Sequence, residues 1–139
     1  MIKVFIDGSA GTTGLRIRGM LEKRADISLI TLSEAARKEI SARKDALNSA
    51  DVAFLCLPDD AAREAVSLVE NGNTIVIDAS TAHRTSPDWA YGFPELSAKH
   101  RAAIANGKRI ANPGCYASGF IALVYPVSYT HLTLPTKRI

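Results

Sequence analysis

The chain has 139 residues, 47% of them hydrophobic, which is enough to bury one proper core, so we expect a single domain. Its 17 basic and 14 acidic side chains give a net charge of +3, and because the basic residues form no stripe with interleaved aromatics, we expect no nucleic-acid partner. The longest apolar runs fall far short of the roughly 20 residues that cross a bilayer, which argues against a membrane protein.

Strand-like and helix-like segments alternate along the chain. Short runs rich in Val, Ile, Leu and Phe predict strands at residues 2–6, 27–32, 52–57 and 74–77. Strands that alternate with helices are typical of a doubly wound α/β fold with a parallel sheet. The first strand follows Met1 directly and leaves no room for a signal peptide, so we expect a cytoplasmic protein.

Helices are expected between these strands. One should cover residues 12–23 and bury Ile17, Met20 and Leu21. The polar segment 34–49 is expected to be helical in part. Another helix should start at Asp59 or Asp60, either of which can cap it, and should stop at Asn71 and Gly72. Its buried side is predicted to carry Ala62, Ala65, Val66 and Val69.

A glycine-rich turn separates the first strand from the first helix. Gly8 and Gly11 would let the backbone approach a pyrophosphate, to which hydroxyls and the helix N-terminus would donate hydrogen bonds. The spacing is G-x-x-G-x-x-G, so a turn with a purely structural role stays open. A P-loop is disfavoured, because Leu15 stands where that motif has lysine. The turn consists of Gly8, Ser9, Ala10, Gly11, Thr12, Thr13 and Gly14.

The end of the second strand bears on the choice of cofactor. NAD sites carry Asp or Glu about 20 residues past the glycines to hold the ribose hydroxyls. This chain has Ser33 there, with Arg37 and Lys38 a turn further on. Such a set would accept a 2′-phosphate, which favours NADP. The alternative is that Arg37 and Lys38 belong to a solvated helix face.

Cys115 follows Asn112, Pro113 and Gly114 and precedes an apolar helical run, so its sulfur is expected at a helix N-terminus. Unpaired N–H groups and the helix dipole favour a thiolate there. We interpret Cys115 as a nucleophile, although in isolation it also fits a small buried hydrophobe. Cys56 lies within an expected strand and is assigned to the core. The two cysteines lack the spacing of a zinc site or a disulfide framework, so we expect reduced thiols and no metal.

Five segments in this order resemble N-acetyl-gamma-glutamyl-phosphate reductase in its shorter-chain form. They are GSAGTTG at 8–14, LCLPDD at 55–60, DASTAHR at 78–84, YGFPEL at 91–96 and NPGCYA at 112–117. The likeness covers residues 1–126. It implies a Rossmann-like NADP-binding domain that ends in the helix of the catalytic cysteine.

The resemblance implies an NADP-dependent oxidoreductase of arginine biosynthesis. Cys115 would attack the acyl phosphate, expel phosphate and form a thioester that NADPH reduces to the semialdehyde. Asn112 would place the substrate, and Arg84 matches a phosphate-binding arginine, unless it is an ordinary surface residue. Pro58, Ser80 and Thr81 would border the cofactor or serve as loop and cap residues.

Full-length members of this family carry a second domain for substrate and dimer contacts, including the catalytic histidine, with no counterpart in this sequence. The resemblance therefore implies a homo-oligomer for the full-length form and little or no turnover from this chain. His83, His100 and His131 match no such base and are expected in surface or capping roles. Residues 127–139 look like translated adapter sequence, a non-native tail; a real terminal strand and loop is the alternative.

Two other functions stay open. One is an enzyme like aspartate-semialdehyde dehydrogenase, which shares the general plan of the reductase. The other is a non-catalytic module that senses a dinucleotide through the same fold and uses Cys115 only for packing. A reactive Cys115 would favour an enzyme, whereas an inert one would favour the sensor.

Overall fold

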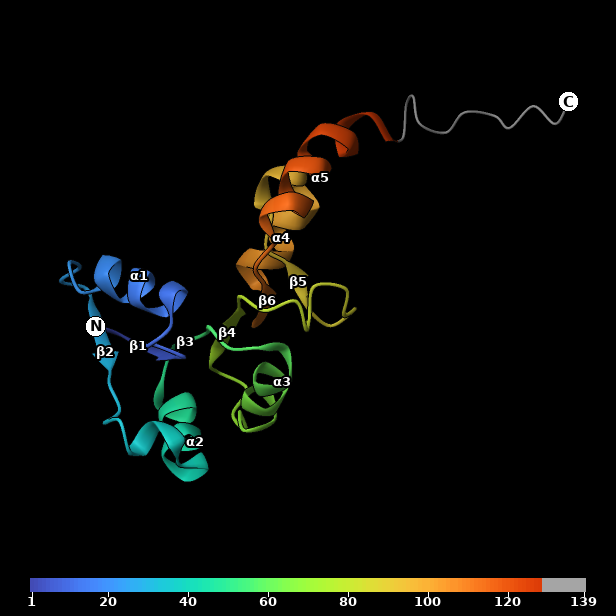
Figure 1. Ribbon diagram of the computed structural model, residues 1–139. Coiled ribbons are helices and arrows are strands. Elements are labelled where there is room, and N and C mark those ends of the chain that lie inside the picture. The colour runs from blue at the N-terminus through green and yellow to red at the C-terminus, as the bar shows by residue number, and fades with distance from the viewer. Residues whose placement is uncertain (129–139) are drawn as a thin grey trace, which may run out of the picture.

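Six strands form one sheet in the computed structural model, which describes residues 1–128 (Figure 1). The strand order is β2-β1-β3-β4-β6-β5, and all neighbouring strands are parallel. Because the chain runs from β1 out to β2 and then crosses back to β3, the sheet is doubly wound, as predicted. The strands are β1 Ile2–Asp7, β2 Ile27–Ile30, β3 Val52–Leu55, β4 Ile75–Asp78, β5 Ala90–Tyr91 and β6 Arg109–Ala111.

Helices cover both faces of this sheet. Figure 1 shows α1 on one face and α2 and α3 on the other. This arrangement buries the strands from two sides, which is why they consist almost entirely of apolar residues. The helices are α1 Thr12–Leu21, α2 Ile40–Ser49, α3 Asp59–Ser67, α4 Ala98–Asn106 and α5 Cys115–Ser128, with 3-10 turns η1 Ala36–Lys38 and η2 Pro94–Leu96.

The main core lies between the sheet and helices α2 and α3. Leu55 from β3 and Val76 from β4 are fully buried there, and the alanines of the two helices allow a close approach to the strands. Ala62 and Ala65 on α3 are fully buried, and Val66 and Val69 pack against the core, as their spacing predicted. The remaining members are Phe5, Ala46, Leu47, Ala50 and Ala53.

Some predicted details are wrong. Met20 on α1 is 57% exposed, because Ile17 and Leu21 share the half-buried side of the helix and Met20 lies about 100° away from Leu21 around the axis. Neither aspartate caps α3: Pro58 occupies the N-cap position, and Asp59 is the first helical residue. The carboxylate of Asp59 accepts hydrogen bonds from Thr81 instead. Strands β2 and β3 also end earlier than predicted.

Helix α5 differs from the others in being apolar and open to solvent. Tyr116 is 93% exposed, Phe120 66% and Leu123 80%, and Figure 1 shows the helix leading away from the sheet. It continues to Ser128, past the predicted domain boundary at 126, and the rest of the predicted tail lies outside the described residues. Within residues 1–128, no helix has the length and apolar character that a bilayer crossing requires.

Candidate active site

The carboxyl ends of the strands meet at one edge of the sheet, because all six run in the same direction. The loops that follow β1, β3, β4 and β6 carry most of the residues predicted to form a site. In doubly wound sheets this edge is where ligands bind. The local geometry of each loop therefore decides what the edge can hold.

The glycine-rich turn lies between β1 and α1, as predicted. Gly8 has a φ of +86°, and a Cβ there would lie 2.2 Å from the carbonyl oxygen of Cys56. A Cβ on Gly14 would lie 2.3 Å from the carbonyl oxygen of Gly8, so α1 packs directly on the turn. A Cβ on Gly11 would make only an ordinary van der Waals contact, 3.5 Å from the carbonyl oxygen of Gly8. Packing therefore requires Gly8 and Gly14, whereas Gly11 leaves the turn accessible.

No side chain caps α1, whose N-cap residue is Gly11. Ala10, Thr12 and Thr13 are exposed and Ser9 is half-buried, so the first-turn N–H groups and these hydroxyls are accessible. Such a helix start suits an anion, since its N–H groups and the helix dipole both favour negative charge. The turn thus has the form of a phosphate-binding loop.

A buried carboxylate adjoins this turn. Asp7, the last residue of β1, is 7% exposed and pairs with Arg43 of α2, whose Nη2 and Nε donate to Oδ2 over 2.9 and 3.1 Å. Nη1 of Arg43 donates to Glu64 over 3.0 Å. Burial works to lower the pKa of Arg43, but the hydrogen bonds that it donates to Asp7 and Glu64 outweigh burial and raise that pKa. Arg43 therefore neutralises a charge that would otherwise repel a phosphate at Gly8. No local sequence pattern predicted this pair, whose members lie 36 positions apart.

Arg37 faces the same region from the turn η1. Its Nε is buried and has no hydrogen-bond partner within residues 1–128. A cavity of about 70 Å³ at the carboxyl ends of β1 and β2 and a hollow of about 220 Å³ beside Gly8 both include Ser9 and Arg37 in their linings. Ser33 precedes this turn, and its Oγ accepts a hydrogen bond from the N–H of Ala36 over 3.2 Å. An unpartnered buried guanidine nitrogen beside a glycine turn fits a phosphorylated ligand.

The loops after β3 and β4 are tied to each other. Thr81 donates from its N–H (2.9 Å) and its hydroxyl (2.5 Å) to Asp59, and these hydrogen bonds lower the pKa of the Asp59 carboxyl. Pro58 is exposed next to them. Ser80 is 8% exposed, and its hydroxyl donates to Asp78 over 2.7 Å. The Ser80 hydroxyl is thus used within the protein, while its loop still borders the edge.

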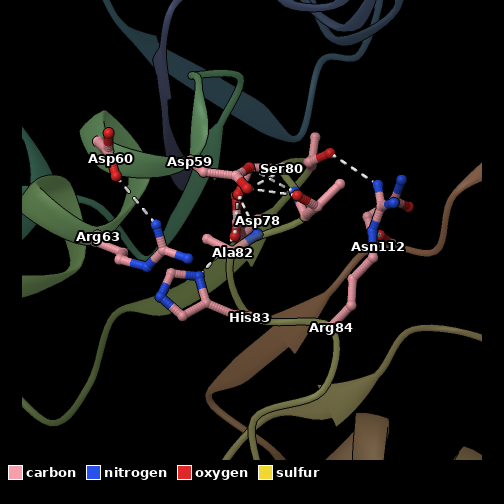
Figure 2. Close-up of polar contacts among 11 residues, drawn as sticks. Asp59, Asp60, Arg63, Asp78, Ser80, Ala82, His83, Arg84 and Asn112 are labelled. Carbon is pink, nitrogen blue, oxygen red and sulfur yellow. Dashed lines mark hydrogen bonds and ion pairs between the residues drawn. The ribbon is translucent and has the colours of Figure 1, made fainter.

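The structure brings Arg84 to the start of the cysteine helix. Its Nε donates to the carbonyl oxygen of Asn112 over 2.9 Å, and a Cβ on Gly114 would lie 2.6 Å from its Nη1 (Figure 2). Cys115 is the first residue of α5 and is exposed, as predicted. Asn112 is exposed, and its side chain donates to the carbonyl oxygen of Pro113 over 3.3 Å. A thiol and a guanidinium therefore lie at one helix start.

The expected roles of the histidines are only partly correct. His100 does take part in a cap, since its ring Nδ1 lies 2.8 Å from Oγ of Ser97, the N-cap residue of α4. His83 is 9% exposed rather than a surface residue, because its ring is hydrogen-bonded to buried Asp78. His131 lies outside the described residues. Within residues 1–128, no cluster of His, Cys, Asp and Glu suits a metal ion.

The chain is similar to a known domain family and to curated reductases. A family model described as semialdehyde dehydrogenase, NAD binding domain, matches residues 34–104. The chain is 57% identical over 124 residues to N-acetyl-gamma-glutamyl-phosphate reductase of Burkholderia cenocepacia, a match covering 89% of this chain and 40% of the relative. It is 58% identical over 125 residues to the reductase of that name from Chelativorans sp., a match covering 90% of this chain and 40% of the relative. The chain thus spans about 40% of the length of the curated relatives it matches.

Solved structures show the same fold at lower sequence similarity. Aspartate semialdehyde dehydrogenase from Francisella tularensis superposes with a TM-score of 0.66 at 20% identity, covering 93% of this chain and 41% of that one. The enzyme of that name from Candida albicans, solved with NADP, gives a TM-score of 0.63 at 19% identity, covering 93% and 47%. At such identities the likeness establishes the fold alone.

Proposed function

Because the chain belongs to the semialdehyde dehydrogenase NAD-binding domain family, we propose that it is the cofactor-binding, nucleophile-bearing part of an N-acetyl-gamma-glutamyl-phosphate reductase. The identity to reductases of that name, far above that to the aspartate semialdehyde dehydrogenases, supports the glutamyl substrate. The activity is proposed for a whole protein, since the chain spans about 40% of those relatives. The contact of Arg84 with Gly114, next to Cys115, is the observation that carries the proposal.

The glycine turn and the η1 turn are proposed to hold NADPH. The N–H groups of the turn and of α1 bind its phosphates, while Arg37 binds the 2′-phosphate. The unpartnered Nε of Arg37 supports this choice, because NAD would leave that buried donor without a phosphate. Ser33, Pro58 and Ser80 border the same site. When bound, NADPH supplies the hydride that reduces the acyl group.

Cys115 performs the covalent part of the reaction. Its thiolate forms a C–S bond to the acyl carbon, the C–O bond to phosphate breaks, and phosphate leaves beside the guanidinium of Arg84. The thioester on Cys115 accepts hydride far more readily than a carboxylate does, which explains the need for a thiol. After reduction the C–S bond breaks, the semialdehyde leaves and the thiolate is regenerated. Asn112, one loop residue away from Gly114, orients the substrate.

Selective alkylation tests this proposal. In the 139-residue chain, iodoacetamide should modify exposed Cys115 much faster than half-buried Cys56. Inorganic phosphate, as a mimic of the leaving group, should slow the reaction at Cys115 only. A Cys115 that reacts no faster than Cys56 and ignores phosphate would instead fit a module that only senses the dinucleotide.

We also propose that residues 127–139 are non-native and that the chain alone has little turnover. The matches to the reductases cover 89–90% of this chain, which supports a non-native segment at residues 127–139. By itself the chain is proposed to bind NADPH and to react at Cys115 with little turnover, because the resemblance puts the catalytic histidine in the remainder of the relatives.

A further inference from the structure

Asp78 plays no part in the chemistry proposed above, although its carboxylate is fully buried at the end of β4. A buried carboxylate is costly unless hydrogen bonds satisfy it. Asp78 accepts from the N–H of Ser80 (2.9 Å), from the Ser80 hydroxyl (2.7 Å) and from Nδ1 of His83 (2.6 Å). The carboxylate therefore folds the segment after β4 back over the end of the strand.

His83 is held at two places. A carboxylate only accepts hydrogen bonds, so Nδ1 of His83 must carry the hydrogen that it shares with Asp78. One face of the ring stacks on Trp89, with centroids 4.1 Å apart and planes 13° apart. A buried ring fixed both at its edge and on its face leaves the backbone of residue 83 little freedom.

Arg84 follows at once, and Figure 2 shows its side chain extending away from His83 toward Asn112. Its Nε donates to the carbonyl oxygen of Asn112 and its Nη2 to that of Ala79, over 2.9 and 3.2 Å. Both acceptors are neutral, so the guanidinium keeps its full charge at the start of α5. Ordering an arginine costs both backbone and side-chain entropy, and a backbone that His83 already fixes removes part of the first cost.

We propose that Asp78 and His83 are positioning residues, which hold the guanidinium of Arg84 at the start of α5 so that the phosphate of an acyl phosphate is bound beside Cys115. Neither residue contacts the substrate; both act through the segment 79–84. The inference rests on the proposed function, since it takes Arg84 as the group that binds the phosphate.

Phosphate protection of Cys115 measures this effect in the 139-residue chain. The phosphate concentration that halves the rate of Cys115 alkylation reports the affinity at Arg84. His83→Phe keeps a ring against Trp89 but removes the Nδ1 donor, and it should raise that concentration about tenfold, as expected for a lost hydrogen bond to a charged group. His83→Asn places an amide N–H near the Nδ1 position but loses the stacking on Trp89, so it should bring that concentration back to within about threefold of the unchanged chain.

Thr74→Val is the matched control. The Thr74 hydroxyl is buried just before β4 and donates to the carbonyl oxygens of Leu47 (3.1 Å) and Ala50 (2.8 Å), far from Arg84. This change also removes a buried hydrogen bond, yet phosphate protection should stay the same. Equal losses of protection in Thr74→Val and His83→Phe would reflect general destabilisation and overturn the inference.

The remaining outcomes separate the inference from the proposed function. If Arg84→Ala abolishes protection and folded His83→Phe does not weaken it, the inference fails alone. If phosphate does not protect Cys115 in the unchanged chain, the role of Arg84 fails and the inference with it. If His83→Phe does not fold, Trp89→Leu replaces it: losing the stacked ring should weaken protection about threefold, and unchanged protection overturns the inference.

Discussion

The guanidinium of Arg84 occupies the space that a side chain on Gly114 would fill. A Cβ at Gly114 would lie 2.6 Å from Nη1 and 3.3 Å from Cζ of Arg84. The backbone does not demand glycine at this position, since Gly8 is the glycine with a positive φ among residues 1–128. Glycine instead leaves room for the arginine, and this contact keeps a positive charge one residue from the proposed nucleophile.

We predict that Gly114→Ala displaces this guanidinium while the fold stays stable, because only the flexible end of a side chain has to move. The unfolding free energy should change by less than about 1 kcal/mol. The phosphate concentration that half-protects Cys115 from alkylation should rise about tenfold. Gly119→Ala, where a Cβ meets nothing within 4 Å, is the control and should leave protection unchanged. Full protection in Gly114→Ala would contradict the contact.

Arg37→Gln should lower the affinity for NADPH without lowering that for NADH. Loss of a charged hydrogen bond to the 2′-phosphate predicts about a 10- to 100-fold weaker NADPH complex. Stability should hold, because Nε of Arg37 has no partner to lose within the described part of the chain. Fluorescence titrations of the unchanged chain and of Arg37→Gln with both nucleotides measure the difference. Equal weakening for NADPH and NADH would argue against a 2′-phosphate site.

Arg43→Met should destabilise the fold. The substitution keeps the apolar stem and leaves Asp7, whose side chain is 9% exposed, with an unpaired charge beside the glycine turn. Breaking a buried pair in this way costs about 3 kcal/mol or more, measurable by urea unfolding. The double variant Arg43→Met with Asp7→Asn should recover part of the loss. No recovery would show that the ion pair is not the cause.

The thiol of Cys56 should make the free energy of unfolding depend on pH in the alkaline range. Burial, and then the charges of Asp7 and Asp78, raise the pKa of its thiol. The folded-state value exceeds the unfolded one, so the buried thiol favours folding below about pH 8.5, and this contribution is lost as pH rises through the raised value. Urea unfolding should therefore show that the free energy of unfolding falls between pH 8 and 10, and that the fall is smaller in Cys56→Ala. If the free energy of unfolding falls equally with pH in the unchanged chain and in Cys56→Ala, the raised pKa of the Cys56 thiol is contradicted.

The sheet was predictable where strands have an apolar run of their own. The strands β1, β2, β3 and β4 and the buried side of α3 carry such patterns in consecutive residues. The strands β5 and β6 span only Ala90–Tyr91 and Arg109–Ala111, too short for a periodic signal, and α4 has no buried residue to mark it. These elements form through tertiary contacts, which a local pattern does not encode.

The candidate site also contains parts with a local sequence signal and parts without one. The glycine turn and Cys115 were predictable because each motif is contiguous and its geometry is local. The pairing of Asp7 with Arg43 joins residues 36 positions apart and has no local signal. The hydrogen bond between Asp78 and His83 did have a local signal. An aspartate at a strand end with a serine two residues on is typical of an Asx turn, which would bury the carboxylate and favour a hydrogen bond to it from a nearby donor.

The role proposed for Cys115 is best measured as turnover in a restored, full-length enzyme. The chain, joined after the cysteine helix to the remainder of the Burkholderia cenocepacia reductase, should oxidise NADPH when given N-acetyl-gamma-glutamyl phosphate. Cys115→Ser in this fusion should lower kcat by at least about a thousandfold, since it removes the nucleophile. Cys56→Ser should keep kcat within about threefold, because Gly8 packs on the Cys56 main chain. Unchanged turnover in Cys115→Ser would contradict the account.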